Sequence, residues 1–306
     1  MRTRTPGAAR CARWLLGAAC GLAVAAAAVA ARQPVMDSAA ELKRIYAGAD
    51  ARLRKSPFKR PLYLESSEAD GRLAGNVYAR VDHDFAALRA TLGKPASWCD
   101  VLALAPNIRQ CAAAEGEGEG DAGAALAVRF GRRYDQPADA AYPVDFDFAV
   151  EATGEKYFRA RLAAAEGPLG TEDYDILIEA IPADGGSFLH FRYAYAYGLS
   201  ARIATSAYLS TKGHDKVGFT VAGTGADGQP RYVGGLRGAA ERNAMRYYLA
   251  IDAYLGAADV APAQRFEASL VRWLDAIEQY PRQLAEVDRE AYLAVKREQG
   301  RAMAMR

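Results

Sequence analysis

Residues 231–255, RYVGGLRGAAERNAMRYYLAIDAYL, decide the fold expected for this chain. They predict one long helix over about Gly235–Leu255. At about 100° per residue, one stripe of this helix collects mainly apolar side chains: Leu236, Ala240, Asn243, Ala244, Tyr247, Ile251 and Tyr254. Glu241, Arg242, Met245 and Asp252 lie on the opposite side. We therefore expect the apolar stripe to pack on a β-sheet.

The chain before this helix has the pattern of a sheet. Turn residues separate six predicted strands, over residues 125–133, 143–152, 156–164, 174–181, 187–199 and 216–222. Apolar and polar residues alternate most clearly at 144–150, where Asp145 and Asp147 interrupt Val, Phe, Phe and Val, and at 189–197. This alternation is typical of antiparallel strands with one buried face.

Shorter elements flank these strands. A helix is predicted over residues 37–55, followed by two strands, 61–66 and 73–81, joined around Asp70-Gly71 as in a hairpin. Residues 84–92 predict a short helix, and residues 97–104 add a second apolar group. After the long helix, residues 262–279 and 283–298 predict a helical tail that is interrupted by Pro281.

The order of these elements resembles the START-like superfamily, also called SRPBCC or Bet v 1-like, over roughly residues 60–256. The resemblance is carried by GRLAGNVYARVDHDFAALRATL (71–92), WCDVLAL (98–104) and KVGFTV (216–221), with the helical stretch quoted above. The chain looks like an exported bacterial branch of that group. The resemblance implies an α+β helix-grip fold, in which a curved antiparallel sheet wraps around a long C-terminal helix. It also implies a cavity for lipids, sterols, polyketides or other apolar ligands.

The N-terminal segment 1–31 predicts a secretory signal peptide. Four arginines precede an apolar run from Trp14 to Ala31, and small residues end it. A retained membrane anchor and a lipoprotein signal at Cys20 are the alternatives. The expected organisation is a signal peptide (1–31), an N-terminal helix (32–58), a START-like domain (59–256) and a helical C-terminal extension (257–306). The product is expected in the periplasm or outside the cell.

Removal of the signal changes the charge and the cysteine content. The whole chain carries +2, and the loss of four arginines leaves −2, so nucleic acid is not an expected partner. Only Cys99 and Cys111 remain, twelve residues apart. In an oxidising compartment they predict a disulfide worth about 3 kcal/mol. No metal or other cofactor is expected.

Several aromatic residues are candidates for the wall of the cavity. Tyr193, Tyr195 and Tyr197 share one side of a predicted strand, and a tyrosine offers both an apolar ring and a hydroxyl to an amphipathic ligand. Ordinary core packing is the simpler interpretation. The predicted ligand-binding set also includes residues from a second strand and from the long helix: Phe146, Phe148, Asn243 and Tyr247.

Charged groups give weaker signals. Asp145 and Asp147 could act in acid–base chemistry or share a cation, but solvent-facing aspartates are the simpler interpretation. Two groups of arginines could hold an anionic head group, although a solvated charged face is expected: Arg159 with Arg161, and Arg237 with Arg242 and Arg246. Residues 223–228, GTGADG, match a dinucleotide fingerprint, but no helix opens directly after them, so a loop is predicted.

The leading functional hypothesis is a periplasmic binding or carrier protein for an apolar or amphipathic, lipid-like small molecule. Transient membrane contact is compatible with this role. One alternative is a cavity-based enzyme of cyclase or hydrolase type, in which Asp145, Asp147 or His190 turns inward. The other is an envelope interaction module that acts through the helical tail 262–306. The sequence leaves the oligomeric state open.

Overall fold

The computed structural model describes residues 35–114, 116, 123–199, 202–203, 215–285 and 287–304. The predicted signal peptide and most of the glycine-rich acidic segment 115–123 lie outside these residues. Within the described part, the main sheet contains these strands: β1 (Leu62–Ala69), β2 (Arg72–Val81), β3 (Ile108–Ala114), β4 (Ala125–Phe130), β5 (Tyr142–Thr153), β6 (Phe158–Glu166), β7 (Thr171–Ala183) and β8 (Gly186–Tyr197).

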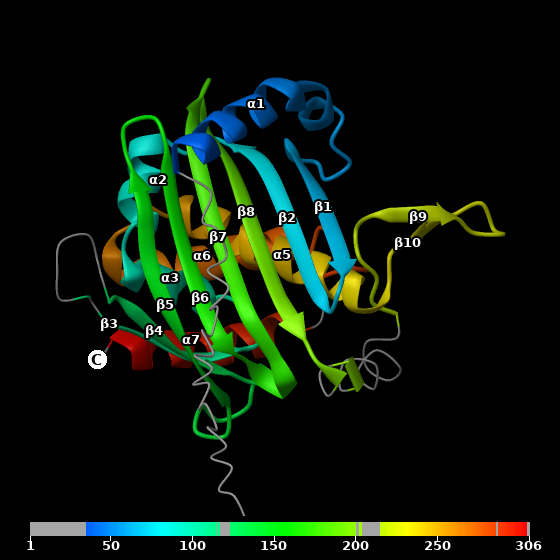
Figure 1. The fold of residues 1–306 in the computed structure, drawn as a ribbon. Helices are drawn as coiled ribbons and strands as arrows, with labels where there is room; N and C mark the ends of the chain where they lie inside the picture. Colours follow the sequence, from blue (N-terminus) through cyan, green and yellow to red (C-terminus); the bar gives the residue numbers. More distant parts are fainter. Residues whose placement is uncertain are drawn as a thin grey trace, which may run out of the picture. The chain divides into compact units, whose positions relative to one another are not determined.

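The strand order of this sheet is β1-β2-β8-β7-β6-β5-β4-β3, and every neighbouring pair is antiparallel (Figure 1). The β1–β2 hairpin turns at Asp70 and Gly71, whose φ angles of 50° and 72° suit a tight type I′ turn. The decisive pairing joins β2 to β8, two strands that lie far apart in the sequence. The β1–β2 hairpin thereby extends the sheet beyond β8, and β1 forms its edge.

Six helices of the described chain surround the sheet: α1 (Val35–Arg54), α2 (Phe85–Leu92), α3 (Pro95–Ala103), α5 (Gly235–Leu255), α6 (Pro262–Ile277) and α7 (Arg289–Ala304). Helix α5 contacts β1, β2 and β8, and α6 packs on α5 in turn. The helix-grip arrangement and the α+β class are therefore confirmed. No helix in the described ranges combines the length and apolar character that a bilayer crossing requires.

Close approach between α5 and the sheet depends on Gly75 in β2. A Cβ atom at this position would lie 2.7 Å from the Cβ of Ala244 and 2.9 Å from the carbonyl oxygen of Ala240. Both separations are too short for ordinary contact, so a side chain here would push the helix away. The small residues Gly75, Ala240 and Ala244 let the two backbones meet.

Helix α1 covers the other face of the sheet. It contacts β1 and β7, and its residues Leu42, Ala49 and Leu53 form a second apolar cluster with sheet residues such as Phe188. A polar network lies in the same layer, with Glu179 and His190 both buried. Helix α5 thus packs on one face of the sheet, and α1 covers part of the other face, over β1 and β7.

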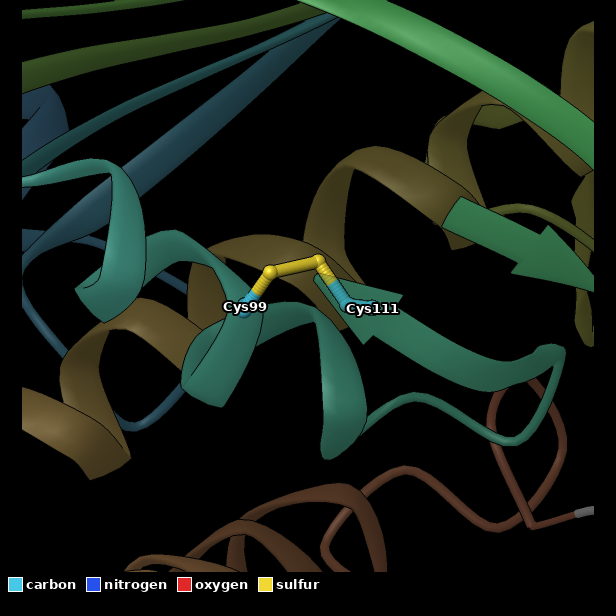
Figure 2. Close-up of a disulfide and its surroundings, with 2 residues drawn as sticks. All are labelled: Cys99 and Cys111. Atoms are coloured by element: carbon cyan, nitrogen blue, oxygen red, sulfur yellow. A yellow bond between two sulfur atoms is a disulfide. The ribbon is translucent and has the colours of Figure 1, made fainter. Parts of the chain in front are cut away.

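The predicted disulfide between Cys99 and Cys111 is present (Figure 2). It joins α3 to the strand β3, with 5.2 Å between the two Cα atoms. The strand itself was not predicted, because the sequence IRQCAAA has no clear alternation. Its position is fixed by pairing with β4 and by the covalent link to α3.

The prediction of a strand over residues 216–222 was wrong for most of its length. Only β9 (Val221–Thr224) forms, and it pairs with β10 (Pro230–Tyr232) in a separate hairpin. The amides of Phe219 and Thr220 donate instead to the carboxylate of Glu241, at 2.6 and 2.9 Å. The GTGADG segment falls in this hairpin, where part of it forms the turn between β9 and β10.

Candidate functional site

A pocket of about 740 Å³ opens at the end of the sheet where the β4–β5 and β6–β7 connections meet the N-terminal half of α5. We call it the tyrosine pocket. Its walls are Asn107, Phe130, Gly131, Arg132, Arg133, Gln136, Pro137, Ala140, Tyr142, Pro168, Leu169, Thr171, Tyr174, Tyr193, Tyr195 and Asn243. The rest of the space between α5 and the sheet is filled by one large apolar core.

Three buried tyrosines from β7 and β8 form the inner wall of this pocket. The rings of Tyr174 and Tyr195 stack with 5.3 Å between centroids, and Tyr193 meets both rings edge-on at 6.1 and 5.8 Å. Strand β7 reaches this arrangement through an irregular register between Glu172 and Asp175, where Asp173 has a φ of 51°. Such bulges re-aim side chains beside binding sites.

Gly167 makes room for the Tyr174 ring. A Cβ atom at this position would clash with the Tyr174 ring and with the Thr171 hydroxyl. That hydroxyl lies 2.8 Å from the Tyr174 hydroxyl and donates to the carbonyl oxygen of Pro168 at 2.7 Å. The β6–β7 turn therefore holds Tyr174 in place through both shape and hydrogen bonding.

Burial strengthens the preference of the tyrosines for the protonated form. It raises the pKa values of Tyr174, Tyr193 and Tyr195, and neighbouring tyrosines add to the rise for the latter two. Burial also raises the pKa of Tyr247 to about 12, against the hydrogen bond from Asn107. All four hydroxyls therefore stay protonated near neutral pH, so each keeps a proton that it can donate.

Two asparagines, Asn107 and Asn243, line the tyrosine pocket next to α5. Asn107 exchanges hydrogen bonds of 3.3 Å with the Tyr247 hydroxyl, and Tyr247 stacks on Tyr193 at 5.4 Å. Asn243 accepts a 2.8 Å hydrogen bond from Arg246. Each asparagine presents an amide group to the pocket while a neighbour fixes its orientation.

A second hollow of about 760 Å³ adjoins the tyrosine pocket and shares Asn107, Arg132, Arg133 and Asn243 with it. We call it the arginine recess. Its remaining walls are Pro106, Tyr134, Asp135, Lys216, Ala239, Arg242, Arg246, Ala285 and Val287. Arg242 and Arg246 are only 3% and 6% exposed. The expectation of a solvated face at these two arginines was therefore wrong, because α6 and the residues before α7 cover this side of α5.

The structure divides the predicted ligand-binding residues into three groups. Tyr193, Tyr195 and Asn243 line the tyrosine pocket. Phe146, Phe148 and Tyr247 are buried behind it; Phe146 packs edge-on against Tyr174 at 6.0 Å. Tyr197 lies outside the lining, and its hydroxyl donates to Glu68 at 2.9 Å.

Sequence reasoning missed four residues of the pocket wall: Tyr174, Asn107, and Arg132 and Arg133, which follow β4. These residues come from a bulge and from turns, where strand alternation does not predict the direction of a side chain. The signal that could have revealed Tyr174 is its place in the strand beside the tyrosines of β8. No sequence pattern marked Asn107.

The proposed catalytic groups lie away from this site. Asp145 and Asp147 are exposed on the face of β5 that points away from the core. His190 is buried on that same outer face, where its ring stacks on Tyr78 and its Nδ1 lies 2.9 Å from Glu179. Within the described ranges, no group of three or more His, Cys, Asp or Glu side chains is placed to hold a metal ion.

Neither a protein-family model nor a curated protein matches the sequence significantly. Solved structures that match this chain include Ara h 8.0201, at 13% identity and a TM-score of 0.29, covering 47% of this chain and 92% of that chain. Norcoclaurine synthase from Thalictrum flavum matches at 13% identity and a TM-score of 0.31, covering 48% of this chain and 79% of that chain. The di-domain ARO/CYC BexL from the BE-7585A biosynthetic pathway matches at 11% identity and a TM-score of 0.33, covering 79% of this chain and 59% of that chain. With TM-scores below 0.5, these matches carry no argument about this chain.

Proposed function

We propose that this protein binds an amphipathic, lipid-like small molecule in the tyrosine pocket and acts as a carrier in the periplasm or outside the cell. The observation that carries the proposal is the group of three buried tyrosines at the inner end of a pocket that is open to solvent. Aromatic rings supply apolar contact area, and a few fixed polar groups orient the ligand.

The chemistry of the wall favours binding over reaction. The tyrosine hydroxyls stay protonated, so they can donate hydrogen bonds but do not act as bases near neutral pH. Asn107 and Asn243 offer neutral amide groups. A ligand with an apolar body and a polar end fits this combination of groups.

A neutral fluorescent probe, N-phenyl-1-naphthylamine, tests the proposal. We expect the probe to bind with enhanced fluorescence and an apolar ligand to displace it. Ala140→Trp should weaken probe binding at least about tenfold, because Ala140 is an exposed residue of the pocket wall where an indole would occupy ligand space.

Ala127→Trp is the matched control, since Ala127 is exposed on the outer face of β4, opposite Asp145. It should bind the probe like the unaltered protein. Equal binding by both tryptophan variants would place the probe elsewhere, and an absence of any probe binding would argue against the proposal.

Export and transient membrane contact belong to the same proposal. The disulfide supports export, because disulfides persist in oxidising compartments. Leu169 on the pocket rim is an exposed apolar side chain, and exposed Leu199 follows Gly198, which donates to Gly170 in the adjacent turn. N-terminal sequencing of the protein from its native cell should give a start near Arg32. Replacement of both leucines by serine should reduce flotation with lipid vesicles.

A further inference from the structure

The Tyr195 hydroxyl is a hydrogen-bond donor of the tyrosine pocket that has no acceptor in the described part of the chain. Its neighbours are paired: the Tyr174 hydroxyl lies 2.8 Å from that of Thr171, and Tyr193 forms a hydrogen bond with Tyr174. Among the described residues, burial and nearby charges act on the Tyr195 hydroxyl, but no hydrogen bond does. Tyr195 itself is 7% exposed and lines the pocket.

A molecule in the pocket can reach this hydroxyl. Some polar atoms of the described chain are fully enclosed and also lack a partner, but the Tyr195 oxygen is not one of them. Because it has no partner and is not enclosed, it remains accessible from the pocket that Tyr195 lines. A largely buried donor of this kind gains most from an acceptor that a ligand brings.

Asn243 brings a second donor to the same wall from α5. Its Oδ1 atom accepts a 2.8 Å hydrogen bond from Arg246, so Nδ2 is the part of the amide that is left to donate. Like the Tyr195 oxygen, Nδ2 is not among the enclosed atoms without a partner. Asn243 is partly exposed and lines the pocket, so its amide also faces the ligand space.

The wall of the pocket favours an uncharged polar group. Its described residues include no aspartate or glutamate that would pair with a cation, and Arg133 already donates to Asp135 at 2.8 and 3.0 Å. A carboxylate loses far more hydration energy than a carbonyl on entering a buried site, and neutral donors do not restore it. A carbonyl or ether oxygen needs only one or two such donors.

We infer that the ligand of the tyrosine pocket is an uncharged molecule with an apolar body and a ketone, ester or ether oxygen, which accepts a hydrogen bond from the Tyr195 hydroxyl. Asn243 supplies a second donor for the polar part of the ligand. The inference rests on the proposed function and deepens it, because it names the polar group of the ligand and the residue that selects it.

The test uses three probes that share a naphthalene ring substituted at the same position: methyl naphthyl ketone, isopropenylnaphthalene and naphthoate. The isopropenyl group has the planar shape of the ketone but carries a CH₂ group in place of the oxygen. Each probe is titrated against the bound neutral naphthylamine probe at neutral pH. We expect the ketone to displace it at least about tenfold more effectively than naphthoate.

Tyr195→Phe should weaken binding of the ketone about threefold to tenfold and leave isopropenylnaphthalene within about twofold. Asn243→Asp keeps an oxygen for Arg246 but removes the Nδ2 donor, and it should also weaken the ketone selectively. Tyr78→Phe is the matched control, since Tyr78 packs with the α1 cluster on the other face of the sheet. It should leave all three probes unchanged.

Two further measurements separate a contact with the ligand from a structural role of the hydroxyl. The C=O stretching band of the bound ketone should lie at lower wavenumber in the unaltered protein than in Tyr195→Phe, because the hydrogen bond weakens the carbonyl bond. The urea midpoint of the unliganded Tyr195→Phe protein should not fall, since the hydroxyl has no partner to lose among the described residues. A lower midpoint would overturn the inference.

The outcomes distinguish this inference from the proposed function. Ketone binding that is indifferent to Tyr195→Phe, or an equal loss for the ketone and the isopropenyl compound, would overturn the role of the hydroxyl and leave the carrier proposal standing. Naphthoate that binds as well as the ketone would overturn the uncharged ligand. Failure of all three compounds and of the naphthylamine probe to bind would overturn both proposals.

Discussion

Glu241 is a buried carboxylate on α5, with 0% of its surface exposed. It accepts hydrogen bonds from the amides of Phe219 and Thr220 and from the Ser66 hydroxyl. One side chain thereby joins the long helix, the edge strand β1 and the segment before β9. The sequence places Glu241 opposite the apolar stripe, but it does not reveal that α5 is covered on that side as well.

Replacement of Glu241 by glutamine should destabilise the fold. The amide would turn an N–H₂ group toward one of the donors that the carboxylate now satisfies, and an unsatisfied buried donor costs about 1–3 kcal/mol. Urea unfolding should show a loss of about 2–3 kcal/mol. Ser66→Ala removes one of these donors and also the acceptor of a 2.8 Å hydrogen bond from Arg237, and should lose about 1–2 kcal/mol. A stability unchanged by E241Q would contradict this account of the contact.

Glu179 makes stability depend on pH. Burial alone would raise the pKa of Glu179, but the hydrogen bond and charge of His190, with Tyr157 and Arg159, outweigh burial and lower this pKa below its ordinary value of 4.5. A depressed carboxyl pKa contributes stability above the unfolded value, and that contribution is lost as pH falls through the folded value.

The free energy of unfolding should therefore decrease as the pH is lowered below about 4.5. Glu179→Gln should be less stable at neutral pH and show a weaker dependence on pH in the acidic range. Glu155→Gln, at an exposed position in the β5–β6 turn, controls for the change in charge. An identical acid slope for E179Q and the unaltered protein would exclude the role assigned to Glu179.

At the level of elements, the sequence predicts most of the secondary structure. The predicted helix 235–255 coincides with α5, and the Asp70-Gly71 turn is where it was expected. Helix α7 begins six residues later than predicted, because Asp288 caps it: its carboxylate accepts the amide of Ala291. The tyrosine strand was recognisable by alternation, whereas the recess depends on turns that only tertiary packing brings together.

The corner between α3 and β3 binds the C-terminal helix. The Tyr292 hydroxyl donates to the carbonyl oxygen of Leu104 at 2.7 Å, and the Lys296 Nζ donates to those of Ala105 and Ile108, both at 2.8 Å. All three carbonyls lie between Cys99 and Cys111. The disulfide therefore closes the loop on which α7 docks.

The double substitution Cys99→Ser with Cys111→Ser should lower the free energy of unfolding by about 2–4 kcal/mol. It should also increase amide hydrogen exchange in α7 more than in the central strand β6, because the docking loop loses its covalent constraint. Lys296→Met should loosen α7 while the disulfide stays intact. Unchanged hydrogen exchange in α7 after removal of the disulfide would show that the docking of α7 does not depend on the disulfide.

For the whole molecule, the contacts bear on the hypothesis that the helical tail docks on a partner. The apolar face of α6 is filled by its own chain, with Leu270, Trp273 and Ile277 in the main core. Tyr292 and Lys296 of α7 are also fully buried. Any partner of the tail would have to use its exposed, charged side. Periodicity predicted the apolar face of the first tail segment, but it could not identify the surface that covers it.

The contacts of Lys296 also determine when the corner between α3 and β3 can complete its packing during synthesis. The two carbonyls that accept hydrogen bonds from its Nζ precede it in the chain by 191 and 188 residues. At about 5–20 residues per second, the ribosome needs on the order of 10–40 s to supply the lysine after these carbonyls have been made. During that interval the corner between α3 and β3 lacks its last helix. The contact between α7 and this corner therefore forms only after α7 has been translated.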